Sequence, residues 1–206
     1  MKKLESKYKP VLFFNILYIL SFTVYYLSIK SFEFVLYVGV LVLFFILIFL
    51  TLHKSKFSPG LLWALSIWGI LHMAGGSVKI GGDVLYRFVF YPFYVNGPDA
   101  ILKFDQVLHF YGFAVTTFAA YHLLKPYLSS TTNYKVVYVM LILIGTGAGV
   151  INEIVEFTAT LFAETGVGGY LNTSLDLISN TLGAVTAVAI IHFNRKRKKA
   201  VQNVCS

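Results

Sequence analysis

The stretch Met140-Leu-Ile-Leu-Ile-Gly-Thr-Gly-Ala-Gly-Val-Ile-Asn-Glu-Ile-Val-Glu-Phe157 is almost wholly apolar, and its only strongly polar side chains are Asn152, Glu153 and Glu156. Glu153 and Glu156 are three residues apart, so on a helix they share one face. An ionisable side chain at membrane depth costs about 3 kcal/mol by insertion scales, and such groups therefore face polar partners or water. The stretch predicts a membrane helix whose carboxylates face a polar site inside a bundle.

The composition of the whole chain supports the same class. Of 206 residues, 57% are hydrophobic and 13% are charged, against roughly 25% charged in soluble domains. The net charge of +8 does not indicate nucleic-acid binding, because the basic residues stand in short flanks between apolar runs. The sequence predicts a single integral membrane domain over residues 1–206, embedded in a lipid bilayer and without nucleic-acid partners.

Six apolar segments are long enough to cross a bilayer, which predicts an all-α, polytopic bundle with six transmembrane helices. They cover about residues 11–29, 34–52, 59–76, 101–124, 136–162 and 175–193. Between the third and fourth segments, residues 77–98 contain Gly81-Gly82, many aromatic side chains and Pro92. Aromatic residues are enriched at the bilayer surface. This connection is therefore expected to be an interfacial or re-entrant segment.

Lys and Arg residues orient the predicted bundle. Of 17 in the chain, all but Lys30, Lys79, Arg87 and Lys103 lie on the side of the two termini, which includes the basic tail 194–206. Because positive residues favour cytoplasmic loops, both termini are expected in the cytoplasm. The prediction is a multi-pass protein of the cell (inner or plasma) membrane with a basic cytoplasmic tail.

With this orientation, polar residues of four segments lie within about 15 Å of the outer boundary, at 1.5 Å per helical residue. The inner half offers no comparable set. The candidate catalytic residues are Asp105, His109, Glu153 and Glu156. The residues expected on the rim of the site, or supporting it, are His72, Asn152, Asp176 and Asn180.

Structural roles compete with these assignments. Asp105 and Asp176 are alternatively helix caps, because Asp favours helix starts, and His72 by itself is typical of an interfacial residue. The two glutamates resist such an explanation, because Lys103 at the outer edge of its segment is the basic residue that comes nearest to them. Residues 145–149 form a small-xxx-small pattern, which favours close helix packing rather than phosphate binding.

Four polar motifs in this order resemble the YjdF-like bacterial inner-membrane proteins and, more distantly, the VanZ-like proteins. The motifs are Leu71-His72-Met-Ala-Gly75-Gly76, Phe104-Asp105-Gln-Val-Leu-His109-Phe-Tyr-Gly112, Asn152-Glu153-Ile-Val-Glu156 and Ser174-Leu-Asp176-Leu-Ile-Ser-Asn180-Thr-Leu-Gly183. The resemblance covers about residues 60–190. It implies a bacterial membrane protein but no reaction, since the YjdF-like family has no assigned biochemical function. The antibiotic resistance associated with VanZ-like proteins is not carried over to this chain.

The chemistry is therefore predicted from residue types. Asp105, His109, Glu153 and Glu156 are suitable ligands for one divalent metal such as Zn, Mn or Fe. Without a metal they supply a general acid and base. Either case predicts a hydrolase or transferase acting on a lipid or lipid-linked substrate. The alternatives are a proton- or ion-coupled transporter of a small solute, and a non-catalytic envelope protein.

Overall fold

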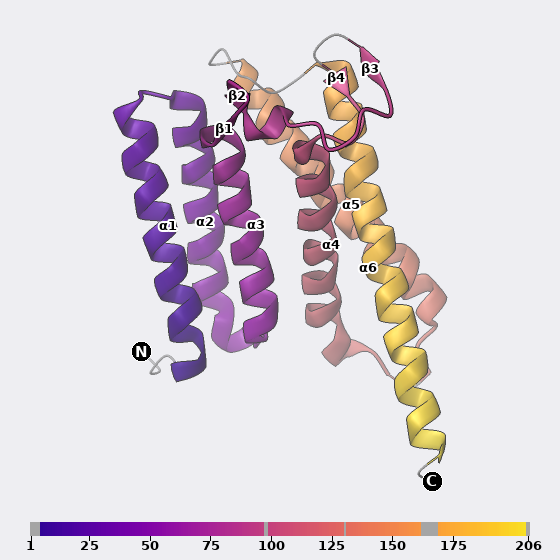
Figure 1. Ribbon diagram of the computed structural model, residues 1–206. Coiled ribbons are helices and arrows are strands. Elements are labelled where there is room, and N and C mark those ends of the chain that lie inside the picture. Colours follow the sequence, from indigo (N-terminus) through magenta and orange to yellow (C-terminus); the bar gives the residue numbers. More distant parts are fainter. Residues whose placement is uncertain (1–4, 97–98, 130, 162–168, 205–206) are drawn as a thin grey trace.

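The computed structural model describes residues 5–96, 99–129, 131–161 and 169–204. Over these residues the chain folds into an up-and-down bundle of six long helices (Figure 1). The helices are α1 (Lys9–Ser28), α2 (Phe32–Ser55), α3 (Pro59–Ser77), α4 (Phe104–Leu124), α5 (Tyr134–Thr160) and α6 (Tyr170–Val204). The N and C termini lie at the same end of the bundle. The expected all-α membrane bundle is confirmed.

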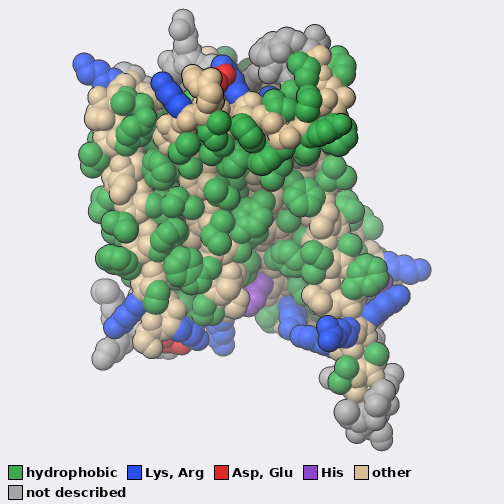
Figure 2. All heavy atoms as spheres, in the orientation of Figure 1, with side chains coloured by type: hydrophobic (Ala, Val, Ile, Leu, Met, Phe, Trp, Pro, Cys, Tyr) green, Lys and Arg blue, Asp and Glu red, His purple; other side chains and the backbone are tan. Residues whose placement is uncertain are grey.

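The outer surface of the bundle suits a bilayer. A broad belt of hydrophobic side chains separates two ends at which Lys and Arg side chains gather (Figure 2). Among the described residues, five helices are long and apolar enough to cross a membrane. The exception is α3, whose 19 residues span about 28 Å and which packs against both α1 and α4. Trp, His, Ser and Gly residues lower the hydropathy of α3.

Each half of the bundle has its own packing. In α1–α3 the buried centre is rich in tyrosine and also contains Ile19, Val38 and Met73, with Tyr26 fully buried. In α4–α6 the helices approach closely at glycines. A Cβ on Gly183 would lie 2.2 Å from the backbone oxygen of Phe110, and one on Gly145 would lie 2.2 Å from Thr117 Oγ1. The close packing predicted for residues 145–149 is thereby confirmed.

The connection between α3 and α4 forms two short hairpins at the end of the bundle opposite the termini (Figure 1). Strands β1 (Lys79–Ile80) and β2 (Asp83–Val84) pair antiparallel, as do β3 (Val95–Asn96) and β4 (Asp99–Ala100). Gly81 and Gly82 both have positive φ angles in the first turn, which glycine adopts without strain. The connection thus lies at the end of the bundle, and its interfacial or re-entrant placement in the membrane stays a prediction.

Helix α6 differs most from its predicted limits. It begins at Tyr170 rather than near residue 175, and it continues through most of the basic tail to Val204. Lys and Arg are good helix formers, and the Arg195 guanidinium lies 3.2 Å from the centre of the Tyr134 ring, which holds this part of α6 against α5. Asp176 is consequently well inside the helix. Its alternative assignment as a helix cap is wrong.

Candidate functional site

The start of α4 positions the first two site residues. The Gln106 side chain accepts hydrogen bonds from the backbone N–H groups of Leu102 and Lys103, at 2.6 and 3.1 Å. Its amide nitrogen donates to the Ala100 carbonyl at 2.9 Å. These bonds fix the first turn of α4, which carries Asp105. His109 follows four positions later and lies on the same face of the helix. Both side chains are buried.

The His109 imidazole is the centre of the polar cluster. Its Nδ1 lies 3.0 Å from Asn180 Oδ1. An amide oxygen only accepts hydrogen bonds, so Nδ1 carries the proton in this pair. The opposite ring atom, Nε2, lies 3.6 Å from Asp105 Oδ1 and 3.9 Å from Glu156 Oε1. With a proton on Nδ1, the imidazole ring is neutral only if Nε2 bears no proton. In that neutral form the lone pair of Nε2 faces two carboxylates.

Helix α5 contributes both of its glutamates to the cluster. Glu153 Oε1 lies 3.4 Å from His109 Nδ1, and within the described residues it accepts no hydrogen bond, although the side chain is only 6% exposed. The Asn152 amide donates to Glu156 Oε1 at 2.8 Å. Gly149 makes room for Asn180, since a Cβ there would lie 2.6 Å from its Nδ2 atom.

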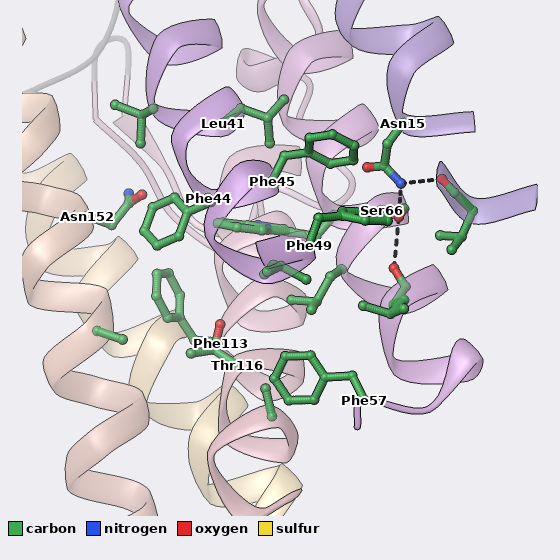
Figure 3. Close-up of a pocket in the computed structure, with 18 of the residues that line it drawn as sticks. Asn15, Leu41, Phe44, Phe45, Phe49, Phe57, Ser66, Phe113, Thr116 and Asn152 are labelled. Carbon is green, nitrogen blue, oxygen red and sulfur yellow. Dashed lines mark hydrogen bonds between the residues drawn. The ribbon is translucent and has the colours of Figure 1, made fainter. Parts of the chain in front are cut away.

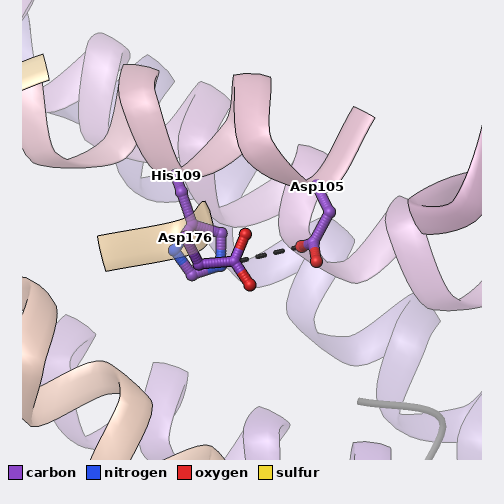
Figure 4. Close-up of side chains that lie close together, drawn as sticks. All are labelled: Asp105, His109 and Asp176. Atoms are coloured by element: carbon purple, nitrogen blue, oxygen red, sulfur yellow. Dashed lines mark ion pairs between the residues drawn. The ribbon is translucent and has the colours of Figure 1, made fainter. Parts of the chain in front are cut away.

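Helix α6 adds a fourth carboxylate. The fully buried Asp176 lies beside His109, with Asp105 facing them from α4 (Figure 4). Asp176 Oδ2 accepts a hydrogen bond of 2.6 Å from the Asn172 amide, and Asn172 Oδ1 accepts one of 2.6 Å from the Lys103 ammonium group. Lys103 is itself only 5% exposed. A buried cation is therefore coupled to Asp176 through one amide.

The ligand atoms are close enough together to share a cation. Asp105, His109 and Asp176 each offer one such atom, and these three lie within 4.8 Å of one another. His109, Glu153 and Glu156 form a second set with the same limit. The three carboxylates predicted as catalytic therefore lie around the fourth predicted residue, His109. Asn152, Asp176 and Asn180, which were predicted to support them, lie in the same cluster.

His72, predicted on the rim of the site, bonds to Tyr86 rather than to one of the carboxylates. Its Nδ1 lies 3.0 Å from the Tyr86 hydroxyl oxygen, and the same hydroxyl donates its proton to the His72 carbonyl oxygen at 2.5 Å. Gly75 admits the Tyr86 ring, since a Cβ there would lie 2.3 Å from it. Burial, with further contributions from Asp105 and Glu156, holds the pKa of Tyr86 well above its usual value. The hydroxyl therefore stays protonated and joins the hairpin segment to α3.

Three residues around the site were not predicted from the sequence as part of it. Tyr86 was assigned only to an aromatic interfacial segment, and Lys103 was noted only as the basic residue nearest to the two glutamates, at the outer edge of its segment. Asn172 precedes Asp176 by four residues, which is the spacing of one helix face. It was missed because the sixth segment was predicted to begin after it.

A largely apolar cavity of about 330 Å³ adjoins the cluster on the side of the termini (Figure 3). It lies between α1, α2 and α3 on one side and α4 and α5 on the other. Asn152, which bonds to Glu156, is in its wall. Phe113, whose ring centre lies 6.1 Å from that of His109, is in the wall as well.

Comparisons with known proteins agree with the membrane assignment. A segment of 101 residues is 32% identical to an uncharacterized protein of Thermotoga maritima, and it covers 48% of this chain and 53% of that relative. The chain thus matches about half the length of this curated relative, and no solved structure matches it. A family model described as "Predicted membrane protein (DUF2238)" matches residues 10–197. The YjdF-like proteins are this family, whereas the resemblance to VanZ-like proteins stays a prediction. The chain belongs to the DUF2238 family of predicted membrane proteins.

Proposed function

We propose that this protein is a membrane-embedded hydrolase or transferase whose His109–carboxylate cluster acts on the polar group of a lipid or lipid-linked substrate. The observation that carries the proposal is the position of His109. Its buried ring is held by Asn180 on one side and faces the carboxylates of Asp105 and Glu156 on the other. Buried ionisable groups within a membrane are costly, so a set drawn from three helices favours function over scaffolding.

The hydrogen bond from Nδ1 to Asn180 leaves Nε2 as the reactive atom of His109. The lone pair of Nε2 and the two carboxylates that face it repel each other, and a cation bound at Nε2 relieves this repulsion. Where that cation is a proton, the imidazolium is a general acid and a neighbouring carboxylate a general base. In hydrolysis the carboxylate takes a proton from water, the hydroxide attacks the substrate, and Nε2 gives its proton to the leaving oxygen.

The same atoms suit one divalent metal such as Zn, Mn or Fe. Zn ligands lie about 2.0–2.2 Å from the ion, so two tetrahedral ligand atoms stand roughly 3.4 Å apart. The separations of 3.6 and 3.9 Å at Nε2 need only a small contraction to reach this value. A metal-bound histidine usually donates its other N–H group to an oxygen, which is the arrangement of His109 and Asn180. A bound metal would polarise the substrate and supply hydroxide.

The surroundings of the cluster favour an amphiphilic substrate. The cluster lies toward the hairpin end of the helices, and an apolar cavity adjoins it on the other side. We place the hairpin end outside the cytoplasm, since most of the Lys and Arg residues lie at the other end. A lipid of the outer leaflet then brings its polar group to the depth of the cluster.

The test is lipid turnover by the purified protein. Wild type is reconstituted in vesicles of a total bacterial lipid extract, and the lipids are followed by chromatography with mass spectrometry. We expect one lipid class to be converted by wild type but not by Glu156→Gln. The matched control is Glu5→Gln, which makes the same change at an exposed residue. Unchanged lipid profiles across extracts from several bacteria would overturn the enzymatic proposal.

Elemental analysis of the same preparations decides between metal and proton. Near-stoichiometric Zn, Mn or Fe in wild type and Glu5→Gln, with loss in Glu156→Gln, supports the metal mechanism. Metal-free wild type that still converts lipid assigns the reaction to acid–base chemistry.

A further inference from the structure

The apolar cavity beside the cluster is large enough to hold a ligand. Its volume of about 330 Å³ falls within the range of ligand pockets. Its wall is mostly aromatic and aliphatic, with contributions from five helices. Native interiors are close-packed and leave few voids larger than a water molecule. A space of this size next to buried ionisable groups therefore suits a ligand.

The polar side chains in the wall show what kind of occupant fits. The Asn15 amide donates to Ser66 Oγ at 2.6 Å and to the Val11 carbonyl at 2.7 Å (Figure 3). Thr116 Oγ1 donates to the Gly112 carbonyl at 2.9 Å. These groups already bond within the protein and have little need of a ligand partner. The body of the cavity therefore suits a hydrocarbon.

One edge of the cavity touches the polar layer. Asn152 connects it to Glu156 through a hydrogen bond, and Phe113 packs near the His109 ring. Trp68, also in the wall, packs near His72 with ring centres 6.0 Å apart. An occupant with an apolar body and one polar end would place that end at the cluster.

The cavity also has access to the bilayer. Phe44 on α2 and Ile151 on α5 both line it, yet their side chains remain 53% and 62% exposed. In the membrane such exposed apolar groups face lipid. The wall residues on α5 begin at Ala148, two turns before Glu156 and toward the end that holds the termini. The cavity thus extends from the cluster toward the bilayer centre. The chain of a lipid in the outer leaflet runs in the same direction from its polar group.

We propose that this cavity is the binding site for the aliphatic chain of the substrate, entered sideways between α2 and α5. The inference rests on the proposed function and adds to it the part of the substrate that gives affinity. The substrate class is a lipid with at least one long acyl or prenyl chain, whose polar group reaches His109. Binding energy from the chain then positions the reacting group.

Photo-crosslinking of purified protein tests the chain site. Two probes are used separately, a palmitic acid analogue and a geranylgeraniol analogue, each carrying a diazirine near the end of its chain. Ala148→Phe fills the cavity, and Ala189→Phe makes the same change at an exposed position of α6. We expect labelling of wall residues on α2 or α5 by one or both probes in wild type and Ala189→Phe, and its loss in Ala148→Phe. Labelling by only one probe identifies the chain type.

Labels spread evenly over the hydrophobic belt, or unchanged wall labelling in Ala148→Phe, would overturn the inference. A second measurement holds even if Ala148→Phe does not fold. In a Trp63→Phe background Trp68 is the one remaining tryptophan, and it lines the cavity. Titration with a dibrominated fatty acid in detergent should quench its fluorescence along a saturable curve. Quenching that rises only linearly with probe concentration counts against the site.

The chain site and the proposed function fail separately. Glu156→Gln should lose lipid turnover and keep wall labelling, because its substitution leaves the cavity intact. Loss of turnover in Glu156→Gln without any wall labelling in wild type refutes the chain site alone. Saturable labelling without turnover of any lipid refutes the enzymatic function alone.

Discussion

Replacing Gly149 by Ala should damage the site through one methyl group. The added Cβ would lie 2.6 Å from Asn180 Nδ2 and 2.8 Å from its Cβ and Cγ atoms. Asn180 is fully buried and holds His109, so it has no free space into which to move. Overpacking of this kind costs about 1–3 kcal/mol.

Gly147→Ala is a matched control on the same helix. A Cβ at Gly147 would meet nothing within 4 Å. Both substitutions gain the same helix propensity, about 1 kcal/mol in water, and this gain cancels between them. The difference between the two variants therefore isolates the clash, and we expect Gly149→Ala to be less stable by about 1–3 kcal/mol.

The assay is thermal unfolding of both variants in the same detergent. At roughly 2–4 °C per kcal/mol for a chain of this length, Gly149→Ala should melt several degrees below Gly147→Ala. Lipid turnover should fall in Gly149→Ala and not in Gly147→Ala, because only the former displaces Asn180. Equal melting temperatures with equal turnover would show that α5 and α6 do not approach as described, and would refute the reasoning.

Three further predictions address topology, charge and the hairpin segment. Reporter fusions after Lys54 and Lys125 should read as cytoplasmic and one within residues 83–98 as extracytoplasmic; the reverse pattern would invert the proposed orientation. Glu153→Gln should fold and melt at or above the wild-type temperature, because it removes a buried charge whose Oε1 accepts no hydrogen bond from the described residues. The same variant should lose lipid turnover, and retained turnover would show that ionisation of Glu153 is not needed. Tyr86→Phe should lower stability by about 1 kcal/mol through loss of its bonds to His72, measured by melting and by faster proteolysis of the hairpins, and unchanged values for both would contradict the anchoring role.

The sequence was sufficient for the bundle and for the histidine and carboxylates of the polar cluster. Long apolar runs specify membrane helices almost independently of tertiary context. Glu153 and Glu156 stand out against such a background because their cost is high. Once the helices alternate in direction, the depth of each polar residue follows from the rise per residue. Function at these positions stays a prediction.

Other features depended on packing that no local pattern reveals. The start of α6 was misplaced because Asn172, Thr173 and Ser174 lower the hydropathy just before residue 175, although Asn172 is buried and bonds to Lys103. The hairpins were missed because each strand has only two residues, too short for alternation to appear. His72 bonds to Tyr86 rather than to a carboxylate. This partner was not predicted, because Tyr86 lies in the connecting segment and the prediction compared depths along the helices only.

The close approach of Gly183 to the Phe110 backbone has a mechanical consequence. Phe110 follows His109 directly, and Gly183 lies three residues after Asn180, so the crossing point of α4 and α6 is next to the hydrogen bond between these two side chains. If the two helices scissor about this crossing, their far ends sweep sideways while atoms near the pivot barely shift. Such a motion would shift the far ends of α4 and α6 and leave the orientation of the imidazole unchanged.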